Sequence, residues 1–422
     1  MSARRINWLR GVTYYMAARL FWFFVGTILY TYLGYPLLLT ILNRRRSKPG
    51  HLKSHQVDVP SVTLLVAAYN EQDVIGEKLE NCLSLDYPRD QLQIIVAADG
   101  SDDRTPDIVR LYAAKGVELS FSPPRKGKMA AINRAMEMAK GDIVVFSDAN
   151  NFYDVDTIRH LVAPFADATV GVVTGAKSVV RGDSPLGESE GLYWQYESFI
   201  KEQETMLGCC TGFSGEILAI RRMLFEAAPE YVINDDFYIS MRIVKQGYRV
   251  AYAPQARSYE RVSPTAEEEV QRRARINAGW FQSIAMGGQV LPWRKPVVTW
   301  QVISHKYLRP LLPWAMIGAA VTNVWAVVRP APADGCRLLR LAAPMNWILL
   351  VLQTAFYLVA LLGGSTTRRE GRLGSLLYVP AFLVNSNIAA IIGLYRFIMR
   401  KQTPLWQRAR RQHERAPRPG RS

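Results

Sequence analysis

The chain has 422 residues, a formal net charge of +16 and a hydrophobic share of 49%. That length is sufficient for one large domain with additional segments. Its four cysteines form no CxxC pair and its five histidines show no ligand spacing, so the sequence excludes a structural zinc site and fits a reducing compartment. No zinc-finger or RNA-binding signature accompanies the positive charge, so we do not expect nucleic acid as a partner.

Four apolar runs without a charged residue are each close to the roughly 20 residues that a helix needs to cross a bilayer. They are 20–42, 310–328, 341–363 and 373–395. Any one of them alone would also fit a buried core helix, but four in one chain favour a membrane protein. We therefore expect an N-terminal membrane anchor at 1–43, and an interfacial segment followed by transmembrane helices at 291–400.

Four basic residues directly follow the first apolar run: Arg44, Arg45, Arg46 and Lys48. Since basic residues beside a span favour the cytoplasmic side, we expect a multi-pass protein of the bacterial inner membrane with residues 44–290 in the cytoplasm. Anionic membrane lipids are the expected partners of the remaining positive charge. The basic tail 401–422 fits poorly if all three C-terminal runs span, so an alternative is that 310–328 or 373–395 lies flat in the interface.

Apolar strand-like runs alternate with helix-like segments between residues 61 and 148. Their periodicity predicts strands at 61–68, 92–99, 117–121 and 142–148, and helices at 70–85, 105–116 and 127–141. This alternation predicts an α/β fold in which helices cover both faces of a parallel sheet. In such sheets ligands bind beyond the carboxyl ends of the strands, so we expect a site at that edge.

Polar residues gather at three of these strand ends, at 69–71, at 99–102, and at Asp148 with Asn150. Such residues are also ordinary turn formers, but three groups at one edge of one sheet favour a binding site. Asp148 and Asn150 alternate around Ala149, so both side-chain oxygens can face one Mg²⁺ or Mn²⁺ ion. A cation of this kind would neutralise the diphosphate of a nucleotide-bound ligand.

The segment 123–133 adds positive charge to the same region. Arg125, Lys126 and Lys128 surround Gly127 and lead into a helix N-terminus, whose free amides and dipole favour phosphate. A solvated basic loop is the alternative interpretation. The chain contains neither a Walker motif nor a G-x-G-x-x-G after the first strand, which argues against a P-loop enzyme and against a dinucleotide-binding dehydrogenase.

Two adjacent acids, Asp235 and Asp236, open an amphipathic helix within 231–254. Acids at this position can simply cap the helix. Two neighbouring carboxylates at the mouth of a charged site can instead raise one another's pKa and provide a general base.

Seven motifs in one order resemble the membrane-bound family 2 glycosyltransferases, which include the synthases of hyaluronan, chitin, cellulose and poly-N-acetylglucosamine. They are VAAYNE, AADGSDD, RKGKMAAIN, SDAN, TGFSGEILAIRR, NDDFYISMRI and QRRAR, and the resemblance covers roughly residues 60–290. It implies a GT-A fold, which is an α/β nucleotide-diphospho-sugar transferase domain with a mixed, mainly parallel sheet, and transmembrane helices at both ends. It also implies an inverting reaction by single displacement.

The resemblance implies a role for each matched residue. Asp236 matches the catalytic base, with Asp235 before it where the family usually has glutamate. Asp99 matches the acid that contacts the nucleobase, and Lys128 the lysine near the donor phosphates. The implied metal ligands are Asp148 and Asn150, and the implied acceptor-binding residues are Gly212, Phe213 and Trp194. The implied site for the nucleotide-sugar donor, a UDP-sugar by family, consists of Ala68, Tyr69, Glu71, Asp99, Lys128, Asp148, Arg272 and Arg275.

Two departures from the family pattern bear on function. The metal motif usually ends in aspartate where this chain has Asn150. Polymerising members carry Q-x-x-R-W, whereas here Ile276 follows Arg275, which is four residues after Gln271; if Gln271 is aligned instead, the arginine position falls on Ala274, and in either alignment the tryptophan is missing. We therefore expect transfer of single sugars or short chains to a saccharide or lipid-linked acceptor in surface or exopolysaccharide biosynthesis. The alternatives are a processive synthase with an export channel, a metal-dependent nucleotidyltransferase, and an inactive membrane partner protein.

Overall fold

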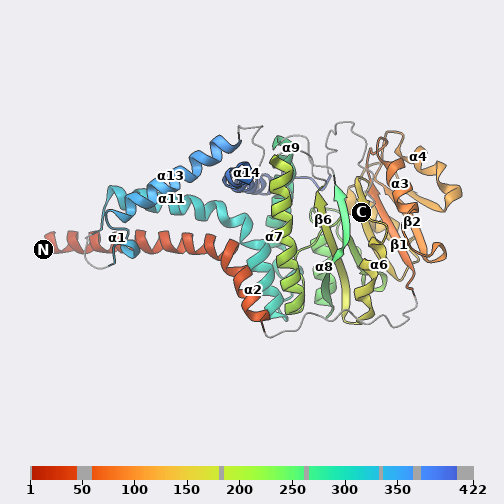
Figure 1. The fold of residues 1–422 in the computed structure, drawn as a ribbon, viewed down its shortest axis with the longest axis horizontal. Coiled ribbons are helices and arrows are strands. Elements are labelled where there is room, and N and C mark those ends of the chain that lie inside the picture. Colours follow the sequence, from red (N-terminus) through yellow and green to blue (C-terminus); the bar gives the residue numbers. More distant parts are fainter. Residues whose placement is uncertain are drawn as a thin grey trace.

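The computed structural model has a strand-rich domain at one end and long apolar helices at the other (Figure 1). It describes residues 2–44, 59–179, 185–260, 266–331, 336–364 and 372–405. The predictions made for Arg45, Arg46, Lys48 and most of the basic tail therefore lie outside the described residues.

An eight-stranded mixed sheet, with the strand order β3-β2-β1-β4-β7-β6-β8-β5, forms the centre of the strand-rich domain. The strands are β1 Val62–Ala68, β2 Leu92–Ala98, β3 Val117–Phe121, β4 Ile143–Asp148, β5 Asn151–Tyr153, β6 Val170–Val179, β7 Leu218–Arg221 and β8 Arg249–Glu260. The first four predicted strands are confirmed to within one residue at their ends. Strands β3, β2, β1 and β4 are parallel, β7 is antiparallel to both of its neighbours, β6 and β8 are parallel, and β5 is antiparallel to β8.

The parallel sheet expected from periodicity is thus correct for one half of the sheet and wrong for the other. The cause is β7, a four-residue strand that lies between β4 and β6 and runs against both. A strand of that length carries no periodicity from which its direction could be predicted. The mixed sheet implied by the family resemblance is confirmed.

Seven helices of this domain pack around the sheet. They are α3 Ile75–Leu83, α4 Thr105–Leu111, α5 Lys128–Met136, α6 Thr157–Val162, α7 Pro185–Leu207, α8 Asp235–Lys245 and α9 Ala266–Met286. Short 3-10 turns lie at Arg89–Gln91, Ala113–Lys115, Ala163–Ala166, Arg222–Leu224, Gly287–Gln289 and Arg309–Leu311. The helix expected at 70–85 begins only at Ile75, because Asn70 has a left-handed φ of 54° and starts a turn.

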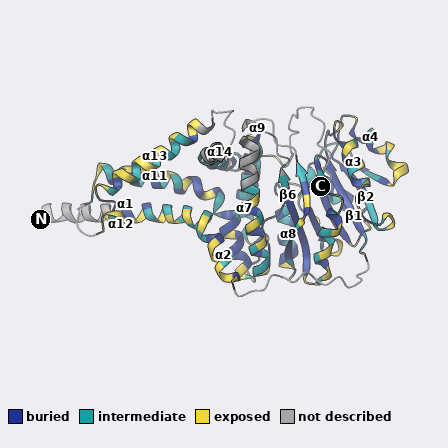
Figure 2. Ribbon diagram, in the orientation of Figure 1, coloured by how far each residue is buried: buried dark blue, intermediate teal, exposed yellow. Residues whose placement is uncertain are grey.

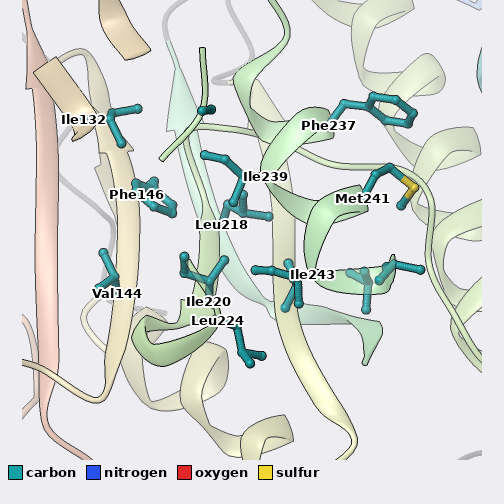
Figure 3. Close-up of a cluster of buried hydrophobic side chains, with 14 of the residues drawn as sticks. Ile132, Val144, Phe146, Leu218, Ile220, Leu224, Phe237, Ile239, Met241 and Ile243 are labelled. Atoms are coloured by element: carbon teal, nitrogen blue, oxygen red, sulfur yellow. The ribbon is translucent and has the colours of Figure 1, made fainter. Parts of the chain in front are cut away.

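Each face of the sheet has its own hydrophobic core. On one face, drawn in Figure 3, Ile132 of α5 and Ile243 of α8 belong to the same cluster as Phe146 of β4 and Ile220 of β7. Complete burial of one such side chain stabilises the fold by about 1.5–3 kcal/mol. Because α5 and α8 share this face, their N-terminal residues, Lys128 and Asp235, come close to each other at the carboxyl end of β4.

The apolar helices make up the other end of the molecule. They are α1 Ser2–Leu29, α2 Tyr35–Asn43, α10 Pro296–Val302, α11 Leu312–Val328, α12 Arg337–Arg340, α13 Met345–Gly364 and α14 Arg372–Ile398, with π-helical turns at Tyr30–Gly34 and Ile303–Tyr307. Four helical stretches within the described residues are long and apolar enough to cross a membrane: Tyr15–Asn43, Arg309–Val328, Met345–Leu362 and Pro380–Ile398.

Helices α11 and α13 expose many apolar side chains, whereas the strands of the sheet are mostly buried (Figure 2). Leu361 and Leu362 of α13, for example, are 71% and 69% exposed. A contiguous apolar surface of this kind is rare on soluble monomers and marks a surface that another apolar phase or partner covers. These helices are therefore not the core helices of a globular domain.

Helix α14 has a different direction from the other long apolar helices. In Figure 1 it is seen nearly end-on, whereas α1, α11 and α13 run along the long axis of the molecule. It packs along α9, and its Arg396 donates a hydrogen bond to Gln271 of that helix. The chain then returns to the strand-rich domain, where a Cβ added to Gly127 would lie 3.7 Å from Leu405 Cδ2 and 3.8 Å from Pro404 Cβ.

Candidate active site

Lys128, the first residue of α5, joins acids from two other elements. Its Nζ lies 2.8 Å from Oδ1 of Asp148, at the end of β4, and 3.4 Å from Oδ2 of Asp235, at the start of α8. Burial alone would lower the pKa of Lys128, but Asp148 and Asp235 outweigh it and hold the pKa above its ordinary value. Three residues that are far apart in the sequence thus meet at the edge where the sequence predicted a site.

Asp236 lies beside this cluster and is partly exposed to solvent. Burial and the neighbouring carboxylate of Asp235 raise the pKa of Asp236 to about 6, against the lowering effects of the Phe237 amide and of Lys128. A Cβ added to Gly215 would lie 3.3 Å from Asp236 Cβ, so the loop 209–215 lies directly against this residue. A carboxylate with a pKa near neutral pH is well suited to accept a proton in a reaction.

Helix α9 fixes the start of α8. A Cβ added to Gly279 would lie 2.3 Å from the Oδ1 atom of Asn234, so only glycine allows the two elements this approach. The side chain of Asn234 also donates a hydrogen bond of 3.2 Å to the carbonyl of Ile276. Asn234 directly precedes the two acids of α8, so α9 determines where those carboxylates lie.

The two arginines that the resemblance assigned to the donor differ in their surroundings. Arg272 forms an ion pair with Glu269, one turn earlier on α9, at 2.9 Å. The guanidinium of Arg275 has no hydrogen bond or ion pair with the residues that the structure describes. Burial lowers the pKa of Arg275, whereas Asp235, Asp148 and Asp236 oppose that change. Arg275 is therefore the cation of α9 that faces the acids of the site.

Asp99, at the end of β2, shapes the basic loop. Its carboxylate is 1% exposed and accepts hydrogen bonds from the backbone amides of Lys126 and Gly127 at 2.9 Å each. The guanidinium carbon of Arg125 lies 3.5 Å from the centre of the Tyr69 ring. The predicted contact of Asp99 with a nucleobase stays a prediction, and the structure adds that Asp99 anchors the basic loop through the amides of Lys126 and Gly127.

The other two predicted donor residues lie at the same edge. The carbonyl of Ala68, the last residue of β1, accepts the amide of Asp99 at 3.0 Å. Glu71 is 7% exposed, and its amide donates to the Thr105 hydroxyl at 2.8 Å. The first bond joins the ends of β1 and β2, and the second joins the segment after β1 to the start of α4.

The predicted metal ligands fit an ion that is shared with a phosphate. The side chain of Asp148 is 36% exposed, and the Asn150 amide nitrogen donates to Glu260 at 2.8 Å, so the amide oxygen can serve as a ligand. Among the described residues no group of three or more His, Cys, Asp or Glu side chains could hold a metal ion. Two oxygen ligands are enough for Mg²⁺ or Mn²⁺ when phosphate oxygens and water complete the shell.

The charge of the site also favours a cation. Asp148, Asp235 and Asp236 supply three carboxylates, whereas Lys128 and Arg275 supply only two positive charges. An additional diphosphate would therefore leave the site strongly negative. A divalent ion offsets that charge.

The predicted acceptor residues lie in two places. Gly212 and Phe213 belong to the loop that runs to Gly215, and the Phe213 ring lies 6.1 Å from the ring of Phe237, next to Asp236. Trp194 lies on α7, with the ammonium of Lys177 5.4 Å from its ring centre. The structure thus brings the loop residues to the acids of the site and places Trp194 at a neighbouring ion-pair network.

Sequence reasoning missed several residues around the site. Lys177 is buried between Glu216, at 3.3 Å, and Glu260, so it links β6 to the end of β8 and to Asn150. Pro404 and Leu405 lie beside the basic loop. No spacing rule connects these residues, since their partners are 39 or more positions away in the sequence.

Comparison with known proteins identifies the family. Residues 60–279 match the model of the "Glycosyltransferase like family 2", which is more than half of the chain. The chain belongs to glycosyltransferase family 2. The resemblance stated from the motifs is thereby confirmed.

Two curated relatives are a glycolipid synthase and a polysaccharide synthase. The beta-monoglucosyldiacylglycerol synthase of Synechocystis sp. is 26% identical over 282 residues, which cover 64% of this chain and 58% of that protein. The poly-beta-1,6-N-acetyl-D-glucosamine synthase of Staphylococcus aureus is 27% identical over 214 residues, which cover 49% of this chain and 52% of that protein. The chain thus spans little more than half the length of these relatives.

A solved structure resembles nearly the whole chain. It is a mannosyltransferase from Pyrobaculum calidifontis, determined in complex with GDP-Man and Mn²⁺. The identity is 25%, the TM-score is 0.65, and the match covers 90% of this chain and 99% of that one. The predicted fold class, a GT-A domain with apolar helices at both ends, is confirmed.

Proposed function

We propose that this family 2 glycosyltransferase is an inverting, metal-dependent enzyme that moves a sugar from a nucleotide-sugar to a saccharide or lipid-linked acceptor. The observation that carries the proposal is the position of Lys128 between Asp148 and Asp235, with Asp236 beside them. This arrangement places a phosphate-binding cation, a metal ligand and a base within one small region.

In the proposed reaction the oxygen of an acceptor hydroxyl attacks the anomeric carbon of the sugar. A new carbon–oxygen bond forms, and the bond from that carbon to the phosphate oxygen breaks, with its electron pair leaving on the nucleoside diphosphate. Asp236 accepts the proton of the hydroxyl, while Lys128 and Arg275 stabilise the charge on the diphosphate. A divalent ion bound by Asp148 and Asn150 would supply further positive charge to the leaving group.

The donor is proposed to be a nucleoside diphosphate sugar, and a UDP-sugar is implied by the family resemblance alone. The mannosyltransferase of similar fold was solved with GDP-Man, so a guanine nucleotide belongs in any donor screen. Ile276 lies on α9, where polymerising members have tryptophan, and its carbonyl accepts a hydrogen bond from Asn234. A platform for a growing chain is absent at that position, which favours transfer of single sugars or short chains over processive synthesis.

We place the strand-rich domain on the cytoplasmic side of the bacterial inner membrane. Helices α1, α11 and α13 would span the bilayer, and α14 would lie along its surface, as its direction in Figure 1 suggests. The contact of Leu405 with Gly127 supports this topology, because it brings the end of α14 to the same side as the donor site. The end of α14 and the basic residues Arg400 and Lys401 after it then lie on the cytoplasmic side, in agreement with the charge rule.

A donor screen tests the proposal. Membranes that contain the full chain are incubated with UDP-glucose, UDP-N-acetylglucosamine or GDP-mannose, with and without Mn²⁺ or Mg²⁺. We expect one donor to give metal-dependent release of nucleoside diphosphate that is lost in Asp236→Asn. Release of pyrophosphate would identify a nucleotidyltransferase, and the absence of turnover in both proteins would identify an inactive partner. Labelled product longer than a few sugars would identify a processive synthase.

A further inference from the structure

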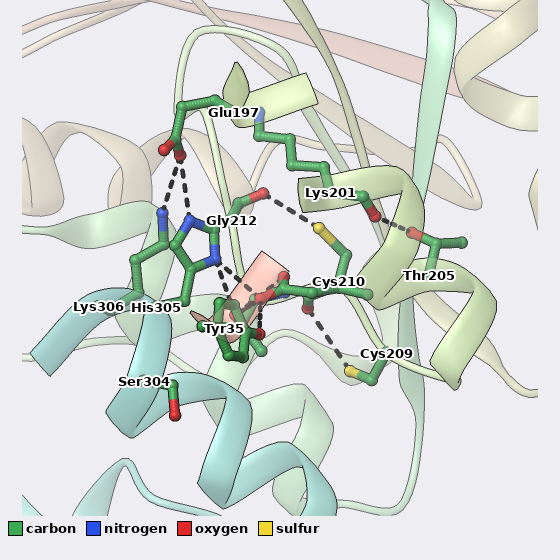
Figure 4. A network of polar contacts seen from close by, with 12 residues as sticks. Tyr35, Glu197, Lys201, Thr205, Cys209, Cys210, Gly212, Ser304, His305 and Lys306 are labelled. Carbon is green, nitrogen blue, oxygen red and sulfur yellow. Dashed lines mark hydrogen bonds and ion pairs between the residues drawn. The ribbon is translucent and has the colours of Figure 1, made fainter. Parts of the chain in front are cut away.

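A buried histidine lies between two glutamates at the junction of the apolar helices and the strand-rich domain (Figure 4). His305, in the π-helical turn Ile303–Tyr307, has its Nδ1 atom 2.8 Å from Oε1 of Glu204 and its Nε2 atom 3.2 Å from Oε2 of Glu197. The side chain of His305 is fully buried, and those of Glu197 and Glu204 are 3% and 0% exposed. None of these residues takes part in the proposed reaction.

His305 bridges the two glutamates. Each of its ring nitrogens lies within hydrogen-bond distance of one carboxyl oxygen, so the ring joins Glu204 to Glu197. Burial raises the pKa of Glu204, but His305 and the hydrogen bonds from Tyr35 and Thr211 outweigh it and keep the pKa below its ordinary value. Burial also raises the pKa of Glu197, but Arg309 and Lys306 outweigh it and hold the pKa well below its ordinary value, so both glutamates carry a negative charge at neutral pH.

The two glutamates differ in how many basic partners they have. Glu197 also lies 3.5 Å from the ammonium of Lys306 and is paired with Arg309. Glu204 has His305 as its one basic partner among the described residues. Removal of one partner of a buried pair is costly, because an uncompensated charge remains in a medium of low dielectric constant. The state of Glu204 thus depends on His305.

Glu204 in turn holds the loop that lies against Asp236. Its carboxylate accepts the backbone amide of Thr211 at 2.7 Å and the Thr211 hydroxyl at 2.9 Å. Three residues further on, Ser214 receives a hydrogen bond of 3.1 Å from the buried ammonium of Lys201. A Cβ added to Gly212 would lie 3.3 Å from His305 Cε1, so the loop packs on the histidine itself.

The same glutamate is bound to the N-terminal apolar stretch. The hydroxyl of Tyr35, the first residue of α2, donates a hydrogen bond to Oε1 of Glu204, and the side chain of Tyr35 is fully buried. Tyr35 belongs to the candidate span Tyr15–Asn43, and the turn that carries His305 leads into the candidate span Arg309–Val328. Two membrane-side segments therefore meet the loop 209–215 at one carboxylate.

We propose that His305 is a positioning residue that fixes the loop 209–215 to the membrane-side helices through Glu204, so that an acceptor hydroxyl presented from the bilayer meets Asp236. The acceptor-facing role of the loop and the role of Asp236 rest on the proposed function. The fixing of the loop does not, because it follows from the contacts alone.

The experiment compares the full chain in lipid nanodiscs with the variants His305→Gln and His305→Lys. His160→Gln is the control, since His160 is partly exposed on α6 and pairs with Asp156, the residue that precedes this helix. Hydrogen exchange is measured at 209–215 and, as an internal reference, at 128–136 of α5. We expect His305→Gln to accelerate exchange at 209–215 by about tenfold or more, with 128–136 unchanged. His305→Lys supplies a cation and is expected to recover most of the protection.

Activity with the donor found in the screen gives an independent readout. We expect His305→Gln to lower kcat by about tenfold or more while the KM for the nucleotide-sugar stays within about twofold, since the donor side is untouched. Unchanged exchange at 209–215, or equal acceleration at 128–136, would overturn the proposal. If His305→Gln does not fold, Tyr35→Phe tests the same connection. It removes the hydroxyl that donates a hydrogen bond to Glu204, and it should accelerate exchange at 209–215 but not at 128–136. An inactive wild type with the expected exchange pattern would refute the proposed function and leave the proposed fixing of the loop intact.

Discussion

The molecule contains two clusters of charge that differ in how completely they are paired. Around Lys128 there are more carboxylates than cations, Asp148 is 36% exposed, and the pKa of Asp236 is raised to about 6. Around His305 the carboxylates are buried and each one has a basic side chain within hydrogen-bond reach. Paired buried networks make a structure rigid, whereas unpaired charge in an open site is available to a ligand. The difference fits the two proposed roles: the cluster around Lys128 reacts, and the cluster around His305 holds the loop 209–215 in place.

The largest expected effect is that of Asp236→Asn, which removes the proposed base but keeps the shape of the side chain. We expect kcat to fall about 10²–10⁴-fold. Binding of the nucleoside diphosphate product, measured by calorimetry on the purified chain, should change little. A variant that keeps more than half of the wild-type kcat would show that Asp236 is not the base.

Lys128→Met should have the next largest effect, because it removes the cation that we propose binds the diphosphate. We expect kcat/KM for the nucleotide-sugar to fall about 10²–10³-fold. Lys128 lowers the pKa of Asp236, so its loss should also move the acidic limb of the rate profile to higher pH. Arg110→Met is a matched control, since Arg110 pairs with Asp107 on the exposed surface of α4. Equal losses in both variants would contradict a specific role for Lys128.

A smaller effect concerns the pH dependence. The base is active when it is deprotonated, so kcat/KM of the wild type should decline as the pH falls through about 6, the raised pKa of Asp236. Asp235→Asn removes a neighbouring negative charge that raises this pKa, and we expect the limb to shift to lower pH by about one unit. Rates measured between pH 4.5 and 8 test this expectation, and an unchanged limb or a shift to higher pH would contradict the effect of the Asp235 charge on Asp236.

The smallest effect is expected for Gly279→Ala, which tests the packing that positions the acids. The added methyl group would meet the Asn234 side chain at 2.3 Å, and overpacking of this kind costs about 1–3 kcal/mol. We expect a lower midpoint of thermal unfolding and a reduced kcat. Gly76→Ala in α3 is the control, because its Cβ would meet Tyr112 at an ordinary 3.8 Å and alanine favours the helix. A higher midpoint for Gly279→Ala than for Gly76→Ala would show that α9 can shift without cost.

Much of the fold and of the cluster around Lys128 could be predicted from the sequence, because both depend on short-range patterns: apolar runs, and polar residues at the ends of strands and helices. The strands β1, β2 and β4 are largely apolar runs, and Asp148, Lys128 and Asp235 lie at strand and helix ends, where sheet topology brings them together. Strand β8 was missed, since polar residues such as Arg257 and Glu260 interrupt its pattern and the register shifts between Gly175 and Ala176 of its neighbour β6.

The cluster around His305 could not be predicted by the same rules. His305 and Glu204 are 101 positions apart in the sequence, and each stands among residues that look like the polar face of an amphipathic helix. Only the packing of α7 against α2 and the π-helical turn Ile303–Tyr307 makes them neighbours. Long-range pairs between buried charges leave no periodicity in the sequence, which is why a scan for ligand spacing among the histidines found nothing.

The contact of Pro404 and Leu405 with Gly127 has a practical consequence. These residues come after every apolar helix of the chain, yet they line the loop that leads into Lys128. A soluble fragment cut at the boundaries of the matched family region would lack them, and it would also lack His305. We therefore expect a fragment without the apolar helices to have reduced activity. The full chain in detergent or in nanodiscs is the better material for biochemical work.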